Sequence, residues 1–185
     1  QTSYNLKLTY IIQIPKDKFT HYGVTPLLDY NLKYWYITPA IYDGNWHYYS
    51  NKNLDDLFIP KTDIDLQIVF PKNYVLTSEL DVIDTRENSD TQTVILKGKD
   101  RIDSKLFLNQ LPVYNTVETD RFSIISNITE EGLEASNKAL ITDRITEFIS
   151  THLGEYPHKK LVVTEIDTKK DPIYGLNQLP EVFRP

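Results

Sequence analysis

The sequence predicts a mainly β fold followed by a C-terminal α/β segment, an α+β arrangement. Several short runs alternate apolar and polar residues, which is the period of a strand with one buried face. A single stretch near the C-terminus shows helical spacing instead, and a strand-like run follows it. The short spacing between the alternating runs favours an antiparallel sheet or sandwich over a parallel α/β fold.

The predicted strands begin at residues 4–14, where six apolar residues alternate with mostly polar ones until Pro15 ends the run. Those six are Tyr4, Leu6, Leu8, Tyr10, Ile12 and Ile14. Residues 16–33 predict a loop, because turn-forming residues recur in them. The remaining strands are expected at 63–70, 74–76, 91–97, 106–108 and 122–125, with the polar stretch 84–90 as a hairpin turn or longer loop.

The C-terminal part predicts one long helix over residues 130–153, or two helices with a break before Asn137. Asn127 is a candidate N-cap, and Gly154 stands where a helix-ending glycine belongs. Residues 160–166 then predict a buried strand, and the rest is rich in turns. We therefore expect a β domain over residues 1–126 and a second unit over 127–185.

Composition narrows the classes of function. A net charge of −6 without a basic stripe argues against a nucleic-acid partner. No apolar run reaches the ~18 residues that a membrane span needs. The absence of cysteine excludes disulfides, thiolate metal sites and a cysteine nucleophile. The chain has no methionine and begins inside a strand pattern, so we expect it to be a piece of a longer polypeptide.

The histidines and acidic residues are not spaced as in known catalytic or metal-binding motifs. The zinc-peptidase motif HExxH does not occur, nor do G-x-S-x-G, a Walker loop or G-x-G-x-x-G. His152 and Glu155 straddle the expected helix end, as does His158, so they predict no shared metal-binding face. We interpret His152 as a residue that favours the helix C-terminal dipole, and the acidic stretch 81–90 as a solvated loop.

Aromatic residues gather at 34–49, which holds both tryptophans and several tyrosines. One interpretation is packing within the core or between sheets. The other is a ligand or domain-contact surface with Trp46, Tyr48 and Tyr49 as anchors.

Several segments together resemble the aminopeptidase N family of zinc metallopeptidases, especially its bacterial branch. The segments Trp35-Tyr36, Ala40-Ile-Tyr42-Asp43, Trp46 and Pro71-Lys-Asn-Tyr-Val75 resemble the family's N-terminal β domain. Gly154-Glu-Tyr-Pro157, followed by Lys160-Leu-Val-Val-Thr164, is similar to the opening of its thermolysin-like catalytic domain. Residues 174–180 fall where the family carries its substrate-binding loop.

The resemblance implies a substrate-binding role for Gly175, Leu176, Asn177 and Gln178. In the family a glutamate at the position of Gln178 binds the substrate's α-amino group, and a methionine is usual at Asn177. The neutral amide of Gln178 implies weaker recognition of that amine. The family's zinc ligands lie beyond this loop, so the resemblance implies that this chain carries no metal ligand or general base, with zinc held elsewhere in a catalytic parent.

The resemblance thus implies a portion of a zinc metallopeptidase that is not catalytic by itself, with a peptide substrate and the rest of the parent polypeptide as partners. Two alternatives stay open. One is a degenerate, non-catalytic module for peptide binding or assembly, such as the extracytoplasmic part of a membrane-anchored protein; the other is an unrelated all-β interaction domain. We favour an extracytoplasmic location, and the apolar helix face suggests a homo-oligomer.

Overall fold

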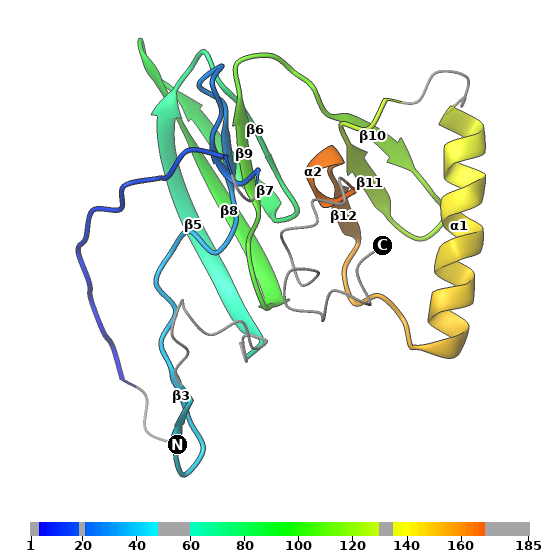
Figure 1. The fold of residues 1–185 in the computed structure, drawn as a ribbon, viewed down its shortest axis with the longest axis horizontal. Coiled ribbons are helices and arrows are strands. Elements are labelled where there is room, and N and C mark those ends of the chain that lie inside the picture. Colours follow the sequence, from blue (N-terminus) through cyan, green and yellow to red (C-terminus); the bar gives the residue numbers. More distant parts are fainter. Residues whose placement is uncertain (1–3, 19–20, 48–59, 130–134, 169–185) are drawn as a thin grey trace, which may run out of the picture.

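The computed structural model describes residues 4–18, 21–47, 60–129 and 135–168. Within these ranges the fold is mainly β, with several antiparallel sheets, one long helix near the C-terminus and a strand after it (Figure 1). The predicted fold class is confirmed.

One antiparallel sheet contains three strands in the order β5-β8-β7. They are β5 Thr62–Pro71, β8 Thr91–Arg101 and β7 Asp81–Glu87. The predicted alternation in β5 is observed, because the even-numbered residues 64–70 turn inward and the odd-numbered ones outward. The polar stretch 84–90 forms the predicted hairpin, because β7 and β8 pair antiparallel across it, but the turn itself is shorter than predicted. The first residues of the stretch complete β7, whose polar side chains suit a solvent-facing edge strand.

A second antiparallel sheet contains four short strands in the order β1-β2-β9-β6. They are β1 Gly23–Val24, β2 Tyr30–Leu32, β9 Leu106–Asn109 and β6 Val75–Ser78. The predicted loop at 16–33 therefore contains two strands. Buried side chains from both sheets form one core cluster, consisting of Leu32, Phe70, Leu80, Val94, Leu96 and Leu106.

The third unit combines strands and helices. Strand β11 (Ser123–Ser126) pairs antiparallel with β10 (Asn115–Glu118) and parallel with β12 (Lys160–Val163). Helix α1 (Ala135–His152) lies in the connection between β11 and β12. This sheet runs across the expected boundary between residues 126 and 127, and that boundary remains a prediction.

Helix α1 ends at His152, close to the predicted end, and Gly154 follows with a φ of 114°. This left-handed conformation favours glycine after a helix. The start of the predicted helix lies outside the described residues. The predicted strand 160–166 is too long: β12 stops at Val163, and helix α2 (Glu165–Thr168) begins. The Thr164 hydroxyl accepts a hydrogen bond from the Asp167 N–H at 3.2 Å, which caps α2.

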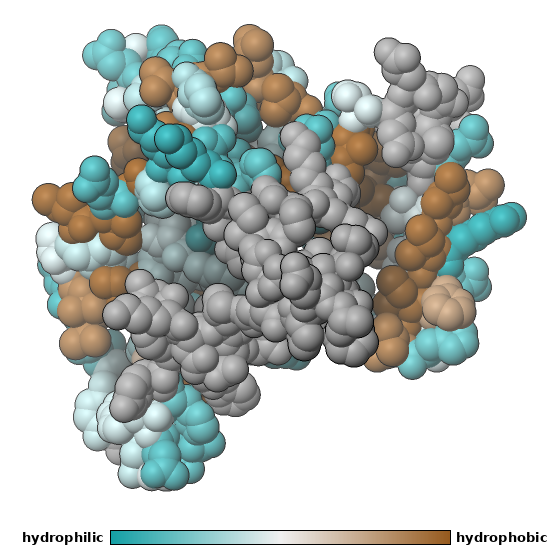
Figure 2. All heavy atoms as spheres, viewed as in Figure 1, coloured by the Kyte–Doolittle hydropathy of each residue, from teal (hydrophilic) through white to brown (hydrophobic). Residues whose placement is uncertain are grey.

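Apolar side chains stay exposed on α1, where Figure 2 shows them along the helix. They are Leu140, Ile141, Ile145, Phe148 and Ile149. The homo-oligomer expected from this face remains a prediction. Among the described residues, no helix combines the length and apolarity needed to cross a membrane.

The first predicted strand, residues 4–14, is not a strand in the structure. The segment runs apart from β5 (Figure 1), and most of its apolar side chains are exposed. The alternation at 4–14 is as regular as that of β5. A strand also needs a neighbour for its N–H and C=O groups, and the described residues supply none here.

Candidate functional site

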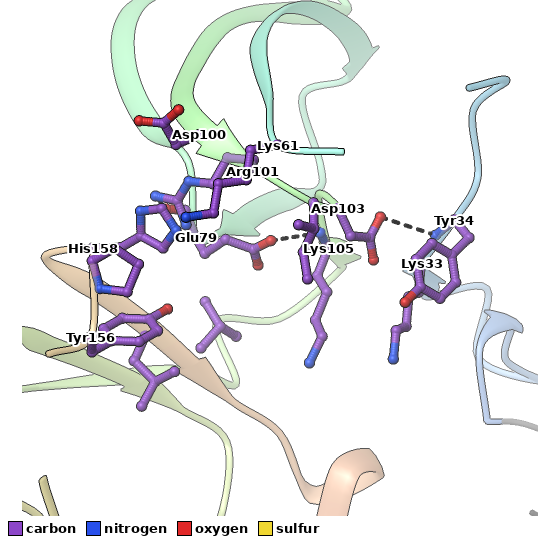
Figure 3. Close-up of a pocket in the computed structure, with 14 residues that line it drawn as sticks. Lys33, Tyr34, Lys61, Glu79, Asp100, Arg101, Asp103, Lys105, Tyr156 and His158 are labelled. Carbon is purple, nitrogen blue, oxygen red and sulfur yellow. Dashed lines mark hydrogen bonds between the residues drawn. The ribbon is translucent and has the colours of Figure 1, made fainter. Parts of the chain in front are cut away.

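A cavity of about 400 Å³ lies where the β sheets meet the β10–β11–β12 unit. Residues from the end of β8, the loop after it and the segment before β12 border the cavity. Charged and ring-bearing side chains converge on it (Figure 3): Lys33, Tyr34, Lys61, Glu79, Asp100, Arg101, Asp103, Lys105, Tyr156 and His158. Apolar side chains of Ile102, Pro157, Leu161 and Val162 complete the lining.

The local backbone turns Arg101 inward at the end of β8. The pairing of β5 with β8 shifts register between Thr62 and Ile64. The intervening Asp63 accepts a hydrogen bond from the Asp100 N–H at 3.1 Å. Asp100 has a φ of 53°, a left-handed conformation that aspartate tolerates better than most residues. The irregularity thus ends β8 with an arginine that is only 7% exposed.

Gly98 makes room for this arginine. A Cβ at position 98 would lie 2.4 Å from Cδ2 of Leu80 and 3.0 Å from Cγ of Arg101. Real Cβ atoms do not approach neighbours so closely, so any larger residue would displace one of these two side chains. Gly98 therefore allows a fully buried leucine and a buried arginine to pack side by side.

The guanidinium of Arg101 is not fully satisfied. Its Nη2 donates a hydrogen bond to the Glu79 carbonyl oxygen at 3.2 Å. Its buried Nε has no hydrogen-bond partner among the described residues. A buried N–H without an acceptor costs about 1–3 kcal/mol, and more for a charged group. Arg101 is thus a buried cation in the wall of the cavity, and one of its N–H groups lacks an acceptor among the described residues.

Two carboxyl groups border the same space and disfavour their charged forms. Burial raises the pKa of Glu79, although its Oε1 accepts a hydrogen bond from the Lys105 N–H at 2.9 Å. Burial also raises the pKa of Asp103, whose Oδ1 accepts a hydrogen bond from the Tyr34 N–H at 3.4 Å. The other oxygen of Asp103 is buried without a partner among the described residues.

The lysines of the cavity differ in how firmly they are held. Lys105 forms a 2.7 Å ion pair with Asp167, which ties the β sheets to α2. Burial works to raise the pKa of Asp167, but hydrogen bonds from Lys105 and Tyr22 hold it below its usual value. The Lys33 ammonium lies 5.5 Å and 5.2 Å from the ring centres of Tyr22 and Tyr34. These contacts leave Arg101 as the buried cation of the cavity.

His158 borders the cavity as a weak base. Burial lowers the pKa of its imidazole, and the positive charge of Arg101 lowers it further. Its ring packs edge-on against Tyr156, with ring centres 5.4 Å apart. Next to Arg101 the cavity therefore offers a neutral imidazole and aromatic walls, a combination suited to an anionic group attached to an apolar body.

The two tryptophans of the aromatic stretch 34–49 have different surroundings. Trp35 packs against the core cluster and donates a hydrogen bond from Nε1 to the Ser104 carbonyl oxygen at 3.1 Å. Trp46 is 63% exposed in the hairpin of β3 (Ile41–Tyr42) and β4 (Trp46–His47), beside Tyr42. Within its described residues, 34–47, the stretch thus packs at Trp35 and is exposed at Trp46.

The remaining predicted site residues lie elsewhere. Gly175, Leu176, Asn177 and Gln178 fall outside the described residues, as do Tyr48 and Tyr49. Nδ1 of His152 lies 2.8 Å from the Phe148 carbonyl oxygen near the end of α1, in keeping with the predicted helix-end role. Within the described residues no cluster of three or more metal-binding side chains forms, and the zinc expected in a catalytic parent remains a prediction.

Sequence reasoning missed Arg101. The available signal was Gly98 inside a strand pattern, which indicates a bulge or a close approach of other atoms. The resemblance to the aminopeptidase N family remains an expectation, since comparison of this chain with protein-family models, curated proteins and solved structures finds no match.

Proposed function

We propose that this chain is a peptide-binding portion of a zinc metallopeptidase-like protein, and that the cavity beside Arg101 receives a carboxylate of the peptide. The peptide-binding role is supported above all by the buried guanidinium of Arg101, which borders a 400 Å³ cavity and has one N–H without an acceptor among the described residues. The metallopeptidase context rests on the ordered resemblance of Trp35-Tyr36, Gly154 to Pro157 and the 174–180 loop.

A carboxylate suits this cavity for two reasons. The planar guanidinium matches a carboxylate with two parallel hydrogen bonds, and charge-assisted bonds of this kind are about twice as strong as neutral ones. The ammonium groups of Lys33 and Lys105 also border the cavity and add positive charge near an incoming anion.

The test is calorimetric titration with two probes, an N-acetylated alanine tripeptide with a free C-terminal carboxylate and the same tripeptide as its C-terminal amide. The acid form should bind at least about tenfold more tightly, since a charge-assisted hydrogen bond contributes about 1.5–3 kcal/mol. Equal affinity for the two probes, or no binding of either, would contradict the proposal.

A matched pair of arginine variants tests whether Arg101 is the residue that binds the carboxylate. Arg101→Lys keeps a positive charge but loses the planar fork, and it should remove most of the preference for the acid form. Arg86→Lys is the control, because Arg86 lies on edge strand β7 and pairs with Asp84 at 2.7 Å. A preference that survives in a folded Arg101→Lys chain would show that another cation binds the carboxylate.

A further inference from the structure

The segment 4–14 is an extended chain whose backbone has no described neighbour. Among the described residues, none of its N–H or C=O groups takes part in a backbone hydrogen bond. Its junction with the rest of the molecule is fixed, because the Pro15 carbonyl accepts a hydrogen bond from the Val24 N–H at 2.8 Å. Beyond that anchor the segment runs clear of the free edge of β5 (Figure 1).

The side chains of this segment add an exposed apolar surface. Leu6 is 79% exposed, and Ile11 is fully exposed. Near Pro15 the segment contacts the body: Ile14 packs against the core cluster, and the Tyr10 hydroxyl accepts a hydrogen bond from the Ile37 N–H at 3.4 Å. An exposed, extended, apolar segment whose backbone has no partner among the described residues is a template for pairing with another chain.

The sequence of the segment is complementary to itself. If two copies pair antiparallel about Thr9, Leu8 of each lies opposite Tyr10 of the other. The same register sets Tyr4 against Ile14 and Leu6 against Ile12, and it sets Lys7 against Ile11, so that no like charges face each other. Because opposed residues point to the same face, all six alternating apolar residues of both copies gather on one side of the ribbon.

We propose that segment 4–14 pairs with segment 4–14 of a second copy about a twofold axis at Thr9, forming an antiparallel ribbon that joins two chains. The pairing supplies partners to backbone groups that have none among the described residues. It also gathers the apolar residues of the segment, of which Tyr10 and Ile14 already contact the body. A two-stranded ribbon is marginal alone, so the dimer is weak and depends on concentration.

The register makes a sharp test possible, because the chain has no cysteine. Thr9→Cys places two thiols opposite each other across the axis, whereas Lys7→Cys faces Ile11 of the other copy. With diamide, which is reduced as it takes two hydrogens from each pair of thiols, Thr9→Cys should form disulfide dimers readily and Lys7→Cys slowly. A mixture of Lys7→Cys and Ile11→Cys chains should give the mixed dimer.

Sedimentation of the full chain over a concentration series supplies the second readout. Leu6→Asp should raise the dissociation constant of the dimer at least about tenfold. The change places a charge on the apolar side of the ribbon in each chain, and it removes the two leucines that the ribbon would bury. Ile145→Asp on the exposed face of α1 is the matched control and should leave the constant unchanged.

A chain that stays monomeric at all concentrations would overturn the proposal, and so would equal cross-linking rates for Thr9→Cys and Lys7→Cys. A dimer abolished by Ile145→Asp but kept by Leu6→Asp would assign the contact to α1 instead.

Discussion

Segment 4–14 and strand β5 carry the same alternating pattern but have different structures. Each sets apolar residues at every second position over about the same length. β5 pairs along its length with β8, and the inward side chains of the pair form the core. Segment 4–14 has no such neighbour among the described residues, and most of its apolar side chains are exposed. Periodicity thus predicts which residues share a face, whereas strand formation requires a second backbone.

We expect the two alternating segments to differ most in how much a truncated leucine lowers the free energy of unfolding. Leu96→Ala in β8, where the leucine is completely buried, should lower the free energy of unfolding by about 2–5 kcal/mol. Leu6→Ala, the equivalent truncation in the exposed segment, should change it by less than about 0.5 kcal/mol. Urea unfolding of a dilute chain measures both. A similar loss from the two substitutions would mean that segment 4–14 is packed in solution.

A smaller loss is expected at Gly98, where β8 departs from a regular strand. Gly98→Ala introduces a Cβ that overlaps Leu80, and such overpacking costs about 1–3 kcal/mol. Lys99→Ala, on the next and more exposed position, is the control and should cost little. The acid-over-amide preference of the tripeptide should fall in the Gly98→Ala chain, because the new methyl group also displaces Arg101. An unchanged preference would show that Arg101 does not depend on the space beside Gly98.

The smallest effect that we expect is a pH dependence of stability caused by Glu79, which borders the cavity. Because burial raises the pKa of Glu79 in the folded chain, its contribution to stability is fully present below the unfolded pKa and is lost as pH rises through the folded pKa. Glu79→Gln removes this ionisation and keeps an acceptor for the Lys105 N–H. Stability of the wild-type chain should therefore fall, relative to Glu79→Gln, as pH rises from the ordinary pKa of a glutamate through the raised pKa of Glu79. Parallel pH profiles from chemical unfolding of the two chains would contradict this.

The sequence predicts much of the fold because most of its elements have local causes. Alternation locates β5 and β8, and Gly154 marks the end of α1. Strand β12 was predicted three residues too long, because its apolar run continues to Ile166 while Thr164 already caps the next helix. The pairing of residues far apart in the chain is not local, which explains the failure at 4–14.

The candidate site was less predictable for the same reason. Its residues come from β8, from the loop after it and from the segment before β12, and no spacing in the sequence relates these segments. Gly98 signalled a close approach, but the identity of the approaching side chain depends on the bulge at Asp63 and the left-handed Asp100. The family's substrate-loop positions, including Gln178, lie outside the described residues, and their role stays a prediction.

Amide hydrogen exchange of the full chain at high dilution tests most directly whether the backbone of segment 4–14 stays unpaired in the single chain. We expect amides of residues 4–14 to exchange at rates close to those of an unfolded chain. Amides of β8, which is hydrogen-bonded on both sides, should approach the protection of global unfolding. Strong protection of residues 4–14 in the dilute monomer would contradict this expectation, because those backbone groups would then already have partners within the same chain.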